Sequence, residues 1–247
     1  SAEIEEMIRV SRETGRFVGV GLKKMFFPAN RKAKAIIGSP EFGGLTTITC
    51  RYLQHLPSVA GRGDAWKMLG FLDHLCHPHS VLRYLAGPVD SIFVRRHAKG
   101  GAVSSIQFAS GAVGSLHFSH GQSGYSFLER TEAVGEGANV VIDNNVRVTY
   151  YRRGGPEGTY GRAGNYFGPD DGAPLHWEPE FSLGQLYNKG LFLLGYAPEI
   201  IDFCQCALAG TPPAVGGLDD ALEIMRIYEA YLEPDGREVA IRKGPVA

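Results

Sequence analysis

The chain has 247 residues, a formal net charge of -1 and 44% hydrophobic residues, which is typical of an ordinary globular protein. Acidic and basic residues are interspersed, which argues against a nucleic-acid-binding protein, and no apolar run reaches the roughly 18 residues of a membrane span. The four cysteines are scattered and residues 1–15 lack the apolar segment of a signal peptide, so we expect a cytoplasmic protein.

The first quarter of the chain combines helical and strand patterns. Residues 2–15 are predicted to form a helix that is followed by a glycine, and residues 17–21 to form a short apolar strand. Residues 28–37 have the pattern of a second helix with proline in its first turn. Residues 45–53 alternate in polarity, which predicts a strand.

The next helix, predicted over residues 69–86, carries the most informative motif. Asp73 and His77 are four residues apart and therefore share one helical face. A carboxylate beside an imidazole can orient the ring and fix its tautomer, as general acid–base chemistry requires. Because Pro78 lies inside this helix, we expect a kink or a late start there.

The second half of the chain is predicted to be mostly antiparallel sheet followed by helices. Short turn signals separate six successive strand patterns, at residues 89–95, 103–108, 113–119, 128–134, 139–142 and 147–151. Residues 153–182 are predicted to form a long irregular loop. Two helices, 194–208 and 217–232, and a last strand, 238–242, complete the chain.

These elements predict an α+β fold, with a large open sheet covered by helices on one face only. The covering layer is expected to comprise residues 69–86, 194–208 and 217–232, which leaves the other face open with Phe108, Phe118 and Tyr150 on it. An exposed aromatic patch usually marks an interface, so we expect a homodimer or homotetramer that assembles through this face.

Four stretches resemble, in the same order, the Gfo/Idh/MocA family of glucose–fructose oxidoreductase and inositol dehydrogenase. They span nearly the whole chain and comprise Val20-Gly21-Leu22-Lys23-Lys24-Met25-Phe26-Phe27-Pro28, then Asp73-x-x-x-His77 with Gly87, then Tyr196-x-x-Glu199-x-x-x-Phe203 with Gly210-x-Pro212-Pro213, then Asp219 to Tyr231 with Gly236-x-x-Val239.

The resemblance implies an NAD(P)-dependent oxidoreductase acting on a sugar, an inositol or a related polyol by hydride transfer. It also implies a C-terminal domain like that of dihydrodipicolinate reductase, which supplies the substrate pocket and the oligomer interface. By this resemblance His77 would exchange the proton of the substrate alcohol and Asp73 would position the ring or contact the substrate. Lys23, Lys24 and Trp66 are the candidate substrate-binding residues.

The chain also departs from the family pattern. It has neither the Gly-x-Gly-x-x-Gly loop nor the Glu-Lys-Pro motif, and Ser80 stands where the family often has an acid. We therefore expect residues 1–23 to be the remnant of a nucleotide-binding domain and residues 24–247 to be the substrate-binding and oligomerisation domain. NAD or NADP would be bound mainly by the missing N-terminal domain, and this fragment alone would be inactive.

Other interpretations remain open. Asp73 and His77 could be a structural helix pair, and His74, His77 and His79 could be metal ligands, although we expect no metal site. The two lysines could be solvated charges at a strand end, and Trp66 could be a core aromatic residue. At the level of function, the alternatives are an NAD-dependent glycoside hydrolase of the same family and a non-catalytic oligomerisation or binding module.

Overall fold

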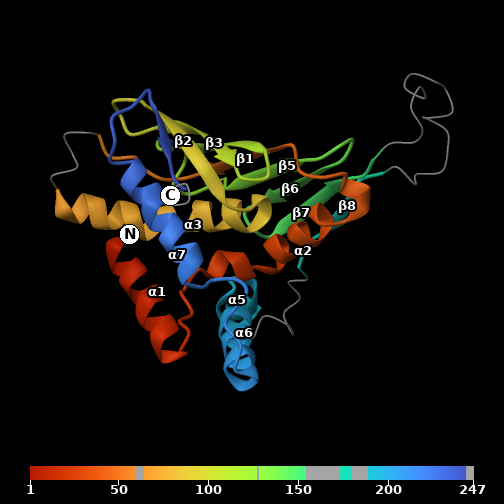
Figure 1. The fold of residues 1–247 in the computed structure, drawn as a ribbon. Coiled ribbons are helices and arrows are strands. Elements are labelled where there is room, and N and C mark those ends of the chain that lie inside the picture. The colour runs from red at the N-terminus through yellow and green to blue at the C-terminus, as the bar shows by residue number, and fades with distance from the viewer. Residues whose placement is uncertain (59–63, 127, 154–172, 180–188, 243–247) are drawn as a thin grey trace, which may run out of the picture.

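The computed structural model describes residues 1–58, 64–126, 128–153, 173–179 and 189–242. It confirms the predicted fold class, a mixed α+β architecture built on one open sheet (Figure 1). The helices are α1 (Ala2–Thr14), η1 (Lys23–Phe26), α2 (Pro28–Ile37), η2 (Pro40–Phe42), α3 (Ala65–Ala86), α5 (Lys189–Leu193), α6 (Tyr196–Ala209) and α7 (Leu218–Ala230). The strands are β1 (Thr47–Tyr52), β2 (Val89–Arg96), β3 (Ala102–Phe108), β4 (Val113–Phe118), β5 (Arg130–Val134), β6 (Asn139–Asp143), β7 (Arg147–Tyr151), β8 (Leu175–Trp177) and β9 (Glu238–Ala240).

The sheet has the strand order β8-β7-β6-β5-β1-β4-β3-β2-β9. Every neighbouring pair is antiparallel except β1 and β4, which run parallel in the middle of the sheet. The first strand of the chain is thus inserted between two strands that come much later. As a consequence, the loops that follow β1 and β4 leave the sheet at the same edge.

One face of the sheet is buried under helices. Along β1 the side chains of Ile48, Cys50 and Tyr52 are buried, whereas those between them are exposed. The helices α2, α3 and α7 lie across this inner face, and α1 and α6 project away from the sheet (Figure 1). Within the described part of the chain, no helix has the length and hydropathy needed to cross a bilayer.

The long helix α3 carries the Asp73/His77 motif. It begins at Ala65, because the Asp64 side chain accepts hydrogen bonds from the backbone N–H groups of Trp66 and Lys67, both at 3.1 Å. The helix runs through Pro78 to Ala86, so the expected late start at this proline is wrong. It ends where Gly87 adopts a φ of 90°, which a glycine tolerates without strain.

The predicted strand at residues 17–21 is wrong. These residues are extended but lack a ladder partner among the described residues, and the backbone contact that ties them down runs from Val20 N–H to the Gly216 carbonyl at 2.7 Å. A strand pattern yields a strand only where a neighbour supplies the rest of the hydrogen bonds.

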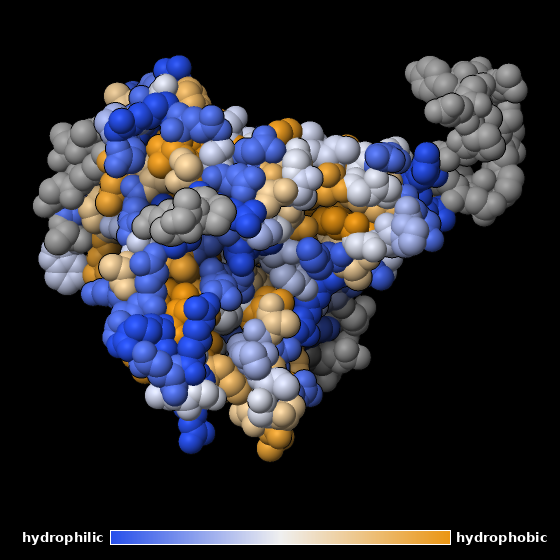
Figure 2. Space-filling model, in the orientation of Figure 1, coloured by the Kyte–Doolittle hydropathy of each residue, from blue (hydrophilic) through white to orange (hydrophobic). Residues whose placement is uncertain are grey.

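The predicted position of helix 194–208 in the layer over the sheet is also wrong. The corresponding helix α6 packs against α5 and η1, and none of its residues is buried. Its apolar side chains instead reach the surface: Leu208, near its C-terminal end, is 90% exposed. The lower end of α6 shows apolar surface at the bottom of Figure 2. The helix α2, which contacts β6 and β7, takes that place in the layer.

The side chains expected on the open face lie on the covered face. Phe108, Phe118 and Tyr150 are all buried in the core, because the alternation places them on the side of Ile48 and Cys50. The open face carries mainly small polar side chains at its centre. Thr49, Ser115 and Ser105 are aligned there on the adjacent strands β1, β4 and β3.

The long loop predicted for residues 153–182 contains an element that the sequence did not indicate. Residues 175–177 form β8, which pairs with β7 at the edge of the sheet, and Lys32 of α2 lies 4.2 Å from the Trp177 ring centroid. Most of the predicted loop lies outside the described residues.

Candidate active site

The candidate proton-transfer residue, His77, sits on α3 in a half-buried position. Asp73 lies one helical turn earlier and is exposed. The His77 ring is 3.7 Å from the Cys76 sulfur at Nδ1, and its centroid is 6.2 Å from that of His74. Because α3 is continuous from Asp73 to His77, the two residues share one helical face, as the spacing predicts. Asp73 acts on the His77 ring through its charge.

The surroundings of His77 keep its imidazole neutral. Burial lowers the pKa of His77 to about 4, and the ammonium groups of Lys24 and Lys23 and the His74 ring add to this effect. The Asp73 carboxylate opposes it more weakly. At neutral pH the ring therefore has a free lone pair that can accept a proton.

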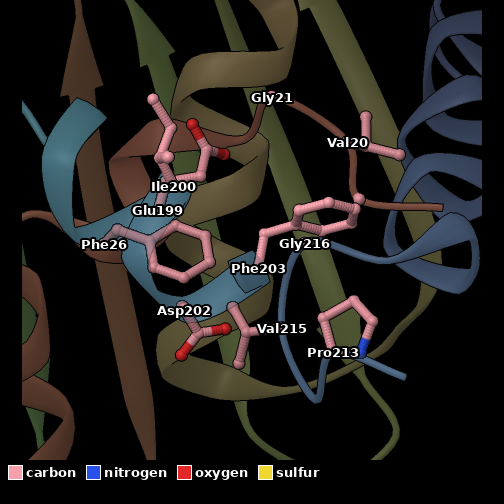
Figure 3. Close-up of a pocket in the computed structure, with 11 residues that line it drawn as sticks. Val20, Gly21, Phe26, Glu199, Ile200, Asp202, Phe203, Pro213, Val215 and Gly216 are labelled. Atoms are coloured by element: carbon pink, nitrogen blue, oxygen red, sulfur yellow. The ribbon is translucent and has the colours of Figure 1, made fainter. Parts of the chain in front are cut away.

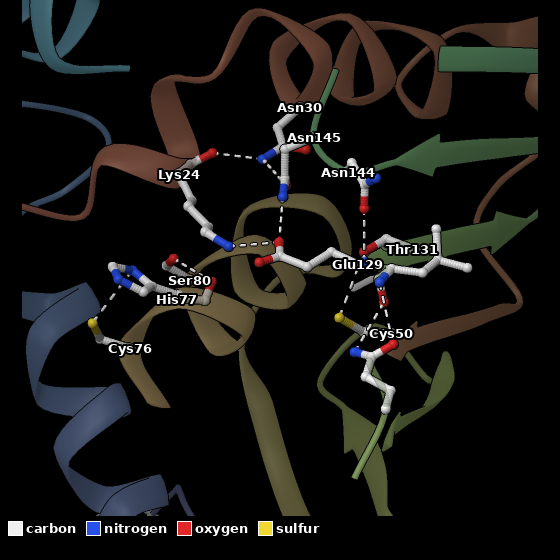
Figure 4. Close-up of polar contacts among 12 residues, drawn as sticks. Lys24, Asn30, Cys50, Cys76, His77, Ser80, Glu129, Thr131, Asn144 and Asn145 are labelled. Carbon is white, nitrogen blue, oxygen red and sulfur yellow. Dashed lines mark hydrogen bonds and ion pairs between the residues drawn. The ribbon is translucent and has the colours of Figure 1, made fainter. Parts of the chain in front are cut away.

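Lys24 is a buried cation held by a network of polar side chains (Figure 4). Its Nζ lies 2.7 Å from Glu129 Oε2 and 4.7 Å from the Tyr52 ring centroid. The Asn145 amide also donates to Glu129, and the Asn30 amide donates to the Lys24 carbonyl at 2.7 Å. The reading of Lys24 as a solvated charge at a strand end is therefore wrong.

Glu129 is the residue of this site that the sequence did not reveal. It precedes β5 and is 105 residues away from Lys24 along the chain. The pair Asn144-Asn145 was recognisable as a turn, and both residues have a positive φ, of 51° and 55°. In that turn the Asn144 side chain accepts a hydrogen bond from the Glu129 backbone N–H at 2.8 Å, which positions the Glu129 backbone.

Lys23 also acts on His77 through its charge, but its own hydrogen-bond partner differs from that of Lys24. Its Nζ donates to the Tyr196 hydroxyl at 2.5 Å and lies 4.2 Å from the Tyr196 ring centroid. Its charge also acts on the half-buried Glu199 of α6, whose pKa is raised by burial and lowered in part by Lys23. The helix α6 thus contributes Tyr196 and Glu199 beside the lysine pair.

Trp66 is not brought to this site. It lies in the first turn of α3 and is 83% exposed, so the alternative of a core aromatic residue is wrong. Eleven residues of helix separate it from His77, which corresponds to about 16 Å along the axis.

The three histidines of α3 do not converge on one point. His79 is buried on the core side of the helix, where its Nε2 lies 3.1 Å from the Tyr231 hydroxyl. Among the described residues, no group of three or more His, Cys, Asp or Glu side chains could hold a metal ion.

A cavity of about 240 Å³ opens beside α6, between Gly19–Gly21 and the segment 213–216 (Figure 3). Phe26, Ile200 and Phe203 line it with apolar surface, and Glu199 lies at its wall. A Cβ at Gly19 would come within 2.7 Å of the Phe203 ring, so this ring packs against the glycine. The Phe203 side chain thus fills the space beside Gly19 that a pyrophosphate at the Gly19-x-Gly21 sequence would need.

Comparison with known proteins gives a domain match over part of the chain and a fold for nearly all of it. Residues 30–141 match the model of the GFO/IDH/MocA C-terminal domain. A comparison with curated proteins finds no match.

Solved structures superpose on nearly the whole chain. An NAD-binding oxidoreductase from Klebsiella pneumoniae has a TM-score of 0.75 at 18% identity, covering 98% of this chain and 71% of that one. A levoglucosan dehydrogenase in complex with NADH and levoglucosan has a TM-score of 0.74 at 17% identity, with coverages of 98% and 70%. A dehydrogenase from Chromobacterium violaceum has a TM-score of 0.71 at 21% identity, with coverages of 95% and 66%.

The chain spans about two thirds of the length of these structures. At such low identities the superpositions establish the fold alone. Residues 30–141 therefore resemble the C-terminal domain of the Gfo/Idh/MocA family, and the chain has the fold of solved oxidoreductases and dehydrogenases.

Proposed function

We propose that this chain supplies the substrate side of an NAD(P)-dependent oxidoreductase that acts on a polyol or a sugar-like alcohol. The observation that carries the proposal is the neutral, half-buried imidazole of His77 beside two lysine ammonium groups. Two structures with this fold support the choice of chemistry: one is a levoglucosan dehydrogenase in complex with NADH and L-sorbose, and the other is an oxidoreductase in complex with NAD+, L-tartaric acid and magnesium.

In the proposed reaction His77 accepts the proton of the substrate hydroxyl as the alcohol is oxidised. The lysine charges keep the imidazole unprotonated beforehand and favour negative charge on the substrate oxygen. The Asp73 carboxylate favours the imidazolium that forms, since its negative charge raises the pKa of His77. In the reverse direction the same imidazolium returns the proton to the oxygen.

We propose that NAD or NADP is bound mainly by a domain that these 247 residues do not include. When bound, the nicotinamide would supply the hydride chemistry. The second Gly-x-Gly sequence, Gly135 to Gly137, fits a pyrophosphate no better than the first, because a Cβ at Gly135 would lie 2.2 Å from the Phe42 carbonyl oxygen. The residues described here thus fit the substrate and its proton, and not the dinucleotide.

The proposal is tested by assaying the full-length protein for formation of NADH or NADPH on a panel of polyols and sugars. His77→Asn should lower turnover by about 10²-fold or more, the scale of losing a general base. His97→Asn, at an exposed histidine in the turn after β2, is the matched control and should leave turnover unchanged. Turnover that survives His77→Asn would contradict the assignment.

The same assay separates the two alternatives. An NAD-dependent glycoside hydrolase would cleave its substrate without net formation of NADH, so sugar products would accumulate while the amount of NADH stays unchanged. A non-catalytic module would bind a sugar or a second protein without forming any product.

We further propose that the chain self-associates through the open face of the sheet. Phe108, Phe118 and Tyr150 do not lie on this face, whose centre carries the small side chains of Thr49, Ser105 and Ser115. A shallow hollow of about 350 Å³ lies over it, beside Phe93. Small side chains allow two such sheets to approach closely.

A further inference from the structure

A cavity of about 300 Å³ lies at the edge of the sheet where β1 and β4 end. Because these two strands are parallel, the loops that follow them leave side by side, and they meet the first turns of α3. His55 comes from the loop after β1, His120 from the loop after β4, and Lys67 and His74 from α3. The cavity adjoins the candidate active site, since the His74 ring centroid lies 6.2 Å from that of His77.

Gln54 lines this cavity, and its buried side-chain amide has an unpaired oxygen. Its side chain is only 7% exposed, and its Nε2 donates to the Phe71 carbonyl at 2.8 Å. A carbonyl accepts and never donates, so this bond fixes which end of the amide is the oxygen. Gln54 Oε1 then has no hydrogen-bond partner. A buried acceptor left in this way calls for a donor, and a hydroxyl group of a ligand would supply one.

Two of the histidines that line the cavity, His55 and His120, are held in place. Their ring centroids are 4.7 Å apart in an edge-to-face arrangement. The His55 ring occupies the space where a side chain at Gly100 would lie, since a Cβ there would come within 1.9 Å of Nδ1. The backbone N–H of Leu56 donates to the Gly100 carbonyl at 2.9 Å, and that of Ser119 to the Tyr52 carbonyl at 2.9 Å. These bonds fix both loops to the sheet.

The charge around the cavity favours an anion. Three imidazoles and the Lys67 ammonium line it, and none of its described lining residues has a carboxylate. Outside the lining, the Asp64 carboxylate lies 3.2 Å from Lys67 Nζ. Burial lowers the pKa of His55, and the neighbouring His120 and Lys67 side chains lower it further, because positive charge beside the ring repels an added proton. A carboxylate in the cavity would relieve that repulsion and accept from the imidazole N–H groups.

We propose that this cavity binds the acid end of a sugar acid, with a ligand hydroxyl donating to Gln54 Oε1 and the carboxylate accepting from His55, His120 and Lys67. The inference rests on the proposed function, because it narrows the substrate class of that site from polyols in general to polyhydroxylated carboxylates. The reacting hydroxyl would lie toward His77, and the carboxylate at the far end would select the substrate.

The test compares D-gluconate with D-glucitol, two chains of equal carbon number of which only the first carries a carboxylate. Isothermal titration of this chain should show gluconate binding at least about tenfold more tightly than glucitol, as one charge-assisted hydrogen bond would give. His120→Asn and Lys67→Met should each remove most of that preference. His117→Asn, on the open face of the sheet three residues before His120, is the matched control and should keep it.

Gln54→Met should weaken both ligands alike, because it removes the acceptor that serves their common hydroxyl groups. If that buried substitution prevents folding, the two charged-group variants still decide the matter. Equal affinities for gluconate and glucitol, or a preference that survives His120→Asn and Lys67→Met, would overturn the inference. The binding measurement needs neither cofactor nor turnover, so it can fail independently of the activity assay. If gluconate shows no preference but neutral polyols are still turned over in a way that depends on His77, the inference fails and the proposed function stands.

Discussion

Removal of the Lys24 charge should be among the most damaging single changes in the chain. The Lys24 and Glu129 side chains are only 8% and 17% exposed, and their charged atoms are 2.7 Å apart. Lys24→Met would leave the Glu129 carboxylate buried with the Asn145 amide as its remaining side-chain donor. Stranding one member of a buried pair costs about 3–5 kcal/mol, and the retained amide bond places this case near the lower end.

The change should also be visible at His77. The Lys24 ammonium is the second cause of the low pKa of His77, after burial. In Lys24→Met the pKa of His77 should therefore rise from about 4 toward the ordinary value of 6.5 without reaching it, because the ring stays buried.

Urea unfolding followed by circular dichroism measures the first effect, and an NMR titration of the imidazole protons measures the second. Lys24→Met combined with Glu129→Gln should recover part of the lost stability, since no buried charge is then left unpaired. Arg147→Met is the matched control, because it breaks an ion pair with Glu178 that is about half exposed and worth at most about 1 kcal/mol. A cost below about 1 kcal/mol for Lys24→Met, with an unchanged His77 titration, would refute the reasoning.

Three further predictions follow from the fold and the site. The pKa values of His77 and His79 in the folded protein, about 4 and about 3, lie below the ordinary 6.5, so the unfolded chain binds more protons than the folded chain between these pH values. The free energy of unfolding should therefore be constant above pH 6.5 and fall as the pH drops toward 4. Urea unfolding measures this dependence, and a free energy that does not change across that range would contradict the prediction. Calorimetric titration of this chain with NAD+ or NADP+ should show no submicromolar affinity, whereas a tight stoichiometric isotherm would place the dinucleotide site within these residues. Analytical ultracentrifugation at micromolar concentration should show a concentration-dependent oligomer that Ser115→Arg weakens, and a single monomeric species for the unchanged chain would exclude assembly through the open face.

Local patterns predicted much of this architecture. The alternation around Cys50 indicated a strand with one buried face, and the spacing of Asp73 and His77 indicated a shared helical face; both features are present. Each depends on residues only a few positions apart, where backbone geometry alone decides which side chains are neighbours.

Long-range pairing could not be predicted in this way. The Lys24–Glu129 pair joins residues 105 positions apart, so no local pattern relates them. The side assigned to Phe108 and Phe118 was wrong for a related reason. Alternation separates the two faces of a strand, but which face is covered depends on where α2, α3 and α7 pack.

Transfer of a deuterium atom tests the central claim most directly. The full-length protein would be given a substrate polyol that carries deuterium on the reacting carbon, together with NAD+ or NADP+, and the nicotinamide would be examined by mass spectrometry. The account predicts one deuterium on each reduced nicotinamide, with a yield that falls by about 10²-fold in His77→Asn. Substrate consumption without deuterium on the nicotinamide, or transfer that is unaffected by His77→Asn, would contradict it.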